Sequence, residues 1–138
     1  MRFPFRAVPD LGWQAVRPRP ILDVVVEGLD VAPQACLIDS GGTAVRFGMH
    51  VADICGVDLS GAPEAKLAVG GAFVDARMAD VSLRVADEGD AHEWLAPVWF
   101  CEPWAPAFGL LGLTGFFDHF EVTIAAYEER IDLDPIAA

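Results

Sequence analysis

The chain has 138 residues, which is the length of one ordinary domain. Its 54% hydrophobic content excludes a disordered acidic tail, although the formal net charge is −12. Without a basic stripe to neutralise phosphates, the composition excludes nucleic acid as a partner and argues against docking on an anionic membrane surface. A small domain this rich in apolar residues must bury part of its surface against a membrane or against another protein.

Residues 1–20 contain four of the nine basic residues and four prolines, with no clear hydrophobic period. We expect them to form an N-terminal arm, followed by a single domain over residues 21–138. The N-terminus lacks the continuous apolar core of a signal peptide, and the three cysteines form no Cys-x-x-Cys pair. These features predict a cytoplasmic protein with no disulfide framework, no metal site and no cofactor.

Short runs of apolar and β-branched residues, separated by turn residues, predict most of the secondary structure. The expected strands are residues 21–27, 34–39, 43–47, 65–69, 72–85, 94–100, 120–126 and 130–133. Gly70 and Gly71 would turn one pair of these strands into a hairpin. A helical turn is expected at 51–55, ending at Gly56, and a second one at 115–118.

Residues 94–117 imitate a membrane span, because Glu102 is their only charged residue and their length suffices to cross a bilayer. Three prolines interrupt this segment, at Pro97, Pro103 and Pro106, and would leave backbone groups without partners in lipid. We therefore expect no membrane partner, but a buried strand, a proline-rich connection and a second buried strand. The predicted whole is a mostly β domain with one or two short helices.

An acidic residue ends a buried apolar strand in the segment LIDSGG, residues 37–42. The carboxylate of Asp39 would be costly there without hydrogen bonds, and its surroundings would tune its ionisation. The Ser40 hydroxyl and the glycine N–H groups are suitable donors, and glycine lets the backbone approach a ligand closely. Taken alone, the residues Asp-Ser-Gly are also common in the tight turn that closes a hairpin.

A second motif lies downstream, where Leu110, Leu111 and Gly112 precede the segment GFFD at 115–118. Apolar-apolar-Asp-Ser-Gly, then a Gly-rich hairpin, then apolar-apolar-Gly before a short helix resembles the retropepsin-like aspartic proteases. The resemblance covers residues 21–133, which is most of the chain. It implies a closed retropepsin-like β-barrel and an aspartic endopeptidase that acts on peptide or protein substrates.

The resemblance also implies a role for each matching residue. Beside the catalytic acid Asp39, these are the active-site loop Ser40, Gly41 and Gly42, the flap Val69, Gly70, Gly71 and Ala72, and the loop support Leu110, Leu111 and Gly112. Two such acids are needed, because one must hold a proton while the other activates water. The chain offers one Asp-Ser-Gly, so the second acid would come from another copy in a two-fold homodimer. That interface would also absorb the apolar excess.

Two positions depart from the family pattern. Gly42 stands where the family usually has Ala or Ser, which loosens the loop. Leu113 and Thr114 stand where many relatives carry Arg followed by an acid or amide, and that Arg normally braces the dimer through ion pairs. The departures favour an alternative, a catalytically inactive retropepsin-like binding or dimerisation module, whereas the retained Asp-Ser-Gly opposes it.

Overall fold

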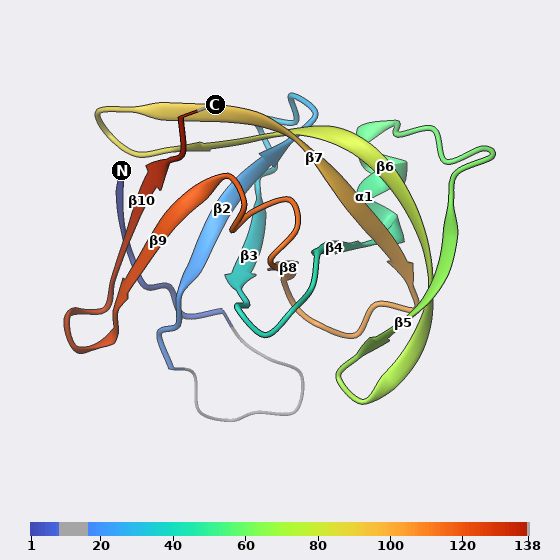
Figure 1. Ribbon diagram of the computed structural model, residues 1–138, viewed down its shortest axis with the longest axis horizontal. Helices are drawn as coiled ribbons and strands as arrows, with labels where there is room; N and C mark the ends of the chain where they lie inside the picture. Colours follow the sequence, from blue (N-terminus) through green and yellow to red (C-terminus); the bar gives the residue numbers. More distant parts are fainter. Residues whose placement is uncertain (9–16, 138) are drawn as a thin grey trace.

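The computed structural model describes residues 1–8 and 17–137 (Figure 1). Its elements are β1 (Arg2–Pro4), β2 (Ile21–Val26), β3 (Gln34–Ile38), β4 (Val45–Gly48), α1 (Met49–Cys55), β5 (Glu64–Val69), β6 (Ala72–Ala86), β7 (Ala91–Glu102), β8 (Gly109–Leu111), β9 (Phe120–Ala125), the 3-10 turn η1 (Ala126–Glu128) and β10 (Arg130–Pro135). The mostly β content predicted from the sequence is confirmed.

The larger sheet has the strand order β2-β3-β8-β4-β7-β6-β5. Strand β2 also pairs with β6, so six of these strands close into a barrel and β5 extends from it. Two pairings are parallel, β3 with β8 and β4 with β7. These parallel pairs bring the carboxyl ends of β3 and β8 together, because parallel strands end at the same edge of a sheet. The closed barrel predicted from the sequence is therefore confirmed.

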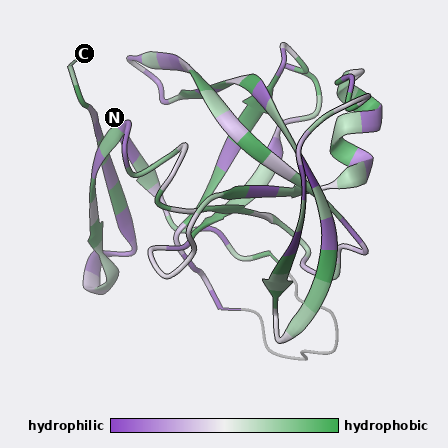
Figure 2. Ribbon diagram, turned by 45° about the vertical axis from the view of Figure 1, so that its right-hand side comes forward, coloured by the Kyte–Doolittle hydropathy of each residue, from purple (hydrophilic) through white to green (hydrophobic). Residues whose placement is uncertain are grey.

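The longest hairpin, β6 with β7, supplies much of the core. Along β6 the side chains of Val81, Leu83 and Val85 are buried, whereas those between them reach the surface. Figure 2 shows hydrophobic and hydrophilic bands along the long strands, and over residues 81–85 of β6 the two kinds alternate, as expected for a strand with one buried face. This period of two predicted β6, whereas β7 was predicted as a buried strand within the apolar segment 94–117.

Helix α1 packs beside the barrel through Val51 and Ala52, which are buried. It ends where the sequence predicts, because Gly56 adopts the left-handed conformation with φ +70°. The second predicted helical turn, at 115–118, is wrong: these residues form turns. Gly115 has φ +96°, outside the helical region, and its N–H donates to the carboxylate of Asp118 at 2.9 Å. The other short helix of the described chain is η1.

A small three-stranded sheet of order β1-β10-β9 lies beside the barrel (Figure 1). The expected N-terminal arm therefore contains a strand, in which Arg2 stands opposite Asp132. The N-terminal ammonium of Met1 donates to the carbonyl of Leu133 at 2.8 Å. Residues 9–16 of the arm lie outside the described residues, and the boundary at residue 20 stays a prediction.

The apolar segment 94–117 contains the two buried strands and the proline-rich connection that the sequence predicts. Most of β7 and the whole of β8 line the barrel, and residues 103–108 connect them. None of the helices in the described part of the chain has the length and apolar character that crossing a bilayer requires.

Candidate active site

Asp39 follows directly after β3 and is half-buried. Its backbone N–H donates to the carbonyl of Leu111 at 2.9 Å, continuing the pairing of β3 with β8. Its carboxylate Oδ1 accepts the N–H of Gly41 at 3.2 Å, and its carbonyl accepts the N–H of Gly42 at 3.1 Å. The loop is thus an Asx-type turn attached to the end of a buried parallel strand pair.

The segment after β8 passes directly against this loop. A Cβ atom added at Gly112 would lie 2.4 Å from the carbonyl oxygen of Ala44 and 2.6 Å from its nitrogen. One residue later, the N–H of Leu113 donates to the carbonyl of Gly42 at 2.9 Å. Only a glycine permits this backbone-to-backbone approach. The structure therefore brings the predicted loop and its predicted support into contact.

The remaining residues of these two groups differ in exposure. Ser40 and Gly41 are exposed, Leu111 is fully buried, and Leu110 is half-buried on the other face of β8. A Cβ atom added at Gly42 would lie 2.8 Å from the Oδ2 atom of Asp39. The glycine that departs from the family pattern thus makes room for this position of the carboxylate.

The predicted flap residues meet at one hairpin turn between β5 and β6. Val69 stands opposite Ala72, and the two residues between them, Gly70 and Gly71, have φ +59° and +81°. Two positive φ angles define the tight turn that suits the twist of a hairpin and that glycine adopts freely. In Figure 1 this turn and the carboxyl end of β3 both point toward the lower side of the view.

Arg46 connects the loop to this hairpin, a link that sequence reasoning missed. From β4 its Nη1 donates to the carbonyl of Ala68 at 2.7 Å, and its Nη2 donates to Oγ1 of Thr43 at 3.2 Å. Burial raises the pKa of the nearby Cys101 thiol to about 11, and the positive charge of Arg46 acts in the opposite direction. The only signal in the sequence was a single arginine inside the apolar run of β4.

No protein-family model and no curated protein sequence matches this chain. Solved structures do. A retropepsin-like aspartic protease from Rickettsia conorii has 15% identity and a TM-score of 0.57, covering 82% of this chain and 80% of its own. The retroviral protease-like domain of Ddi1 from Leishmania major has 15% identity and a TM-score of 0.55, covering 86% and 90%. The EIAV protease in complex with an inhibitor has 12% identity and a TM-score of 0.50, covering 74% and 88%.

This chain has the retropepsin-like fold. The sequence resemblance anticipated that fold, and at identities of 12–15% the structural likeness extends to the fold alone.

Leu113 stands at the position where the sequence resemblance leads us to expect arginine, and its side chain is apolar. Leu113 is 49% exposed although its backbone is bonded to the Asp39 loop through Gly42. The neighbouring Thr114 donates its N–H to the carbonyl of Thr43 at 3.0 Å. An exposed leucine beside a polar loop is suited to contact with another apolar surface.

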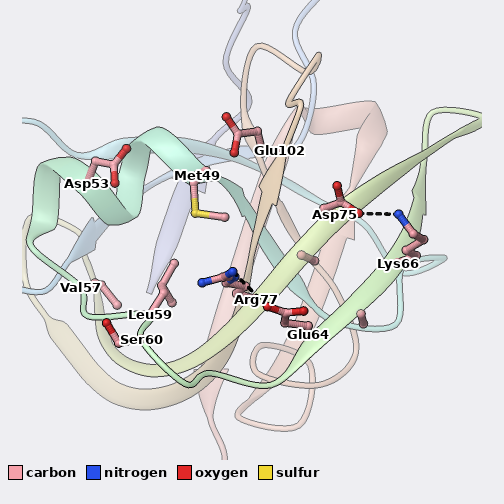
Figure 3. Close-up of a pocket in the computed structure, with 12 residues that line it drawn as sticks. Met49, Asp53, Val57, Leu59, Ser60, Glu64, Lys66, Asp75, Arg77 and Glu102 are labelled. Atoms are coloured by element: carbon pink, nitrogen blue, oxygen red, sulfur yellow. Dashed lines mark hydrogen bonds and ion pairs between the residues drawn. The ribbon is translucent and has the colours of Figure 1, made fainter.

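A separate pocket of about 880 Å³ lies between α1 and the part of the β5–β6 hairpin farthest from its turn (Figure 3). Two ion pairs cross the hairpin there, Lys66 with Asp75 at 2.6 Å and Arg77 with Glu64 at 3.0 Å. None of the predicted site residues lines it. Within the described ranges, no three His, Cys, Asp or Glu side chains are grouped closely enough to hold a metal ion.

Proposed function

We propose that this chain is an aspartic endopeptidase whose catalytic acids are the Asp39 side chains of two copies. The main support is the crossing at Gly112, which holds the Asp39 loop at the end of a buried strand pair. Such rigid support is what a catalytic carboxylate needs, because its position must be kept within a fraction of an ångström. The retropepsin-like fold is consistent with this activity, but a fold by itself does not establish which reaction a protein catalyses.

Two carboxylates close together share one proton, since both cannot ionise cheaply. In the proposed reaction, ionised Asp39 takes a proton from a water molecule while the water oxygen attacks the peptide carbonyl carbon. The partner's Asp39 is protonated and donates to the carbonyl oxygen. The tetrahedral intermediate then loses its C–N bond. The first Asp39 passes its proton to the departing nitrogen, and a hydroxyl of the intermediate returns a proton to the partner's Asp39, which releases a carboxylic acid and an amine.

A two-fold axis beside the loop would bring the second acid into place. An isologous interface places each residue near its own copy, so an acid close to the axis meets its twin. The exposed Leu113 next to the loop offers an apolar contact at this axis, whereas many members of the family are expected to form an ion pair at that position. A protein that stays strictly monomeric at high micromolar concentration in sedimentation velocity would contradict this arrangement.

The substrate would be an extended peptide lying between the loop and the hairpin, with its backbone paired to strand edges. We place its action in a reducing, cytoplasmic setting, which suits the three free thiols of Cys36, Cys55 and Cys101.

The test is cleavage of a peptide library at several values between about pH 4 and pH 7, because a carboxylate dyad is active only where it shares one proton. Asp39→Asn should abolish cleavage. Asp58→Asn is the matched control, because Asp58 also accepts an N–H two residues ahead, from Ser60 at 2.9 Å, in an exposed turn elsewhere. Equal cleavage by wild type and Asp39→Asn would refute the proposal. Peptide binding without cleavage by either protein would favour the inactive binding module.

A further inference from the structure

Among the described residues, no carboxylate lies at salt-bridge distance from the guanidinium of Arg46. Six other basic side chains do have acidic partners at that distance, namely Arg2, Arg6, Lys66, Arg77, Arg84 and Arg130. The two hydrogen bonds of Arg46 go to neutral oxygens, on Ala68 and Thr43. Arg46 is therefore a half-buried cation without an acid at salt-bridge distance, in a chain of net charge −12.

The guanidinium is also incompletely satisfied. Arg46 is half-buried, and its Nε atom is buried with no hydrogen-bond partner. A buried donor without a partner destabilises a protein, and a partly buried charge without a counter-charge adds to that cost. A guanidinium has five N–H donors and only two bonds are made, so beyond the buried Nε–H one N–H on each Nη atom can still donate to a carboxylate. The unfilled donors therefore point to an anionic ligand.

The side chain leaves β4 on the face opposite the barrel core. Its neighbours Val45 and Phe47 are buried in that core, whereas Arg46 reaches Thr43 in the loop and Ala68 one residue before the flap turn. Along β4 it stands between Trp99 of β7 and Leu110 of β8, which are both half-buried on the same face. Arg46 thus lies where the Asp39 loop and the hairpin approach each other, which is where the proposed substrate would pass.

We propose that Arg46 binds the carboxylate of an Asp or Glu side chain in the substrate, close to the scissile bond, and so selects acidic peptides. The inference rests on the proposed function of the Asp39 site. Nη1 and Nη2 each keep one further N–H, and two such N–H groups of a planar guanidinium match the two oxygens of a carboxylate. Nη1 also donates to the carbonyl of Ala68 in the hairpin, so the same side chain would link a bound acidic substrate to the flap.

The test is the sequence preference of cleavage in a proteome-derived peptide library. Wild type should show Asp or Glu enriched at one position beside the cut by about tenfold to a hundredfold, the effect of a desolvated guanidinium–carboxylate pair. Arg46→Gln should lose the enrichment, Arg46→Lys should keep part of it, and Arg46→Glu should shift it toward Lys and Arg. Arg77→Gln is the control, because Arg77 is a hairpin arginine that already has an acidic partner.

A purely structural role for Arg46 would slow all cuts equally and leave the preference unchanged, which would overturn the inference. If wild type cleaves nothing, the proposed function fails, and the inference is then decided by binding. Fluorescence anisotropy would compare two labelled random peptide pools, one with a central Glu and one with a central Gln. Asp39→Asn protein should bind the Glu pool at least about tenfold more tightly, and Arg46→Gln should remove the difference. Equal binding of both pools refutes it.

Discussion

Replacing Gly112 with alanine should destabilise the fold and displace the Asp39 loop together. The added methyl group would lie 2.4, 2.6 and 2.8 Å from the oxygen, nitrogen and carbon of the Ala44 backbone. Favourable contacts between such atoms are about 3.5–4.0 Å, so one of the two segments must move by about 1 Å. No flexible side chain end is available to give way, since all three contacts are backbone atoms.

The size of the effect follows from what this movement breaks. Overpacking of a well-filled site costs about 1–3 kcal/mol. The bonds from Asp39 N–H to Leu111 and from Leu113 N–H to Gly42, both 2.9 Å, cross the same contact. The loss of each bond lowers the free energy of unfolding by about 1 kcal/mol. We expect a total of about 3–5 kcal/mol, which is a large share of the roughly 5–15 kcal/mol that stabilises a typical domain.

Urea unfolding followed by tryptophan fluorescence, at one protomer concentration, would measure this loss as a midpoint about 1–3 M lower. Gly89→Ala is the matched control, because Gly89 lies in the turn after β6 and a Cβ atom there meets nothing within 4 Å. That variant should stay within about 0.5 kcal/mol of wild type. A loss below about 1 kcal/mol for Gly112→Ala would refute the reasoning and with it the rigid support of the loop.

Two further predictions concern the dimer and the dependence of stability on pH. Leu113→Glu should weaken self-association at least tenfold in sedimentation velocity, because it places like charges near the proposed axis, whereas Leu95→Glu, at a leucine 63% exposed on β7, should not. The pKa of Asp132 lies below its ordinary value because of its hydrogen bond from Arg2. A lowered folded-state pKa stabilises the protein above the unfolded value of about 3.9, and this stabilisation is lost as pH falls through the folded-state pKa. Asp132→Asn should therefore lose less Tm than wild type between about pH 5 and pH 2, and parallel curves would contradict this.

Local patterns in the sequence were sufficient for much of the fold. The alternation around Val81, Leu83 and Val85 predicted β6 because each inward side chain is two residues from the next. Gly56 predicted the end of α1, since a left-handed residue there is set by the helix itself. The hairpin at 69–72 followed in the same way from its two glycines.

The turn at 115–118 was mispredicted because distant residues decide its shape. A Cβ atom at Gly115 would lie 3.0 Å from the Val45 side chain and 3.2 Å from the Pro97 carbonyl, two segments far away in the sequence. The pairing of β1 with β10 was likewise unreadable, since it joins the two ends of the chain. Arg46 was missed because its significance depends on Ala68 and on the lack of an acid nearby.

By itself the sequence determined most of the strands, the short helix α1 and the order of two motifs that resemble a known fold, because short-range periodicity and turn residues encode these locally. Only the tertiary structure decided that Gly112 touches Ala44, that Gly42 leaves room for the Asp39 carboxylate, and that β2 pairs with β6 to close the barrel. Each of these contacts joins segments whose approach depends on every strand between them. The candidate site is formed by such contacts. The sequence therefore predicted Asp39, its loop and the segment that supports it, but not how they are arranged in space.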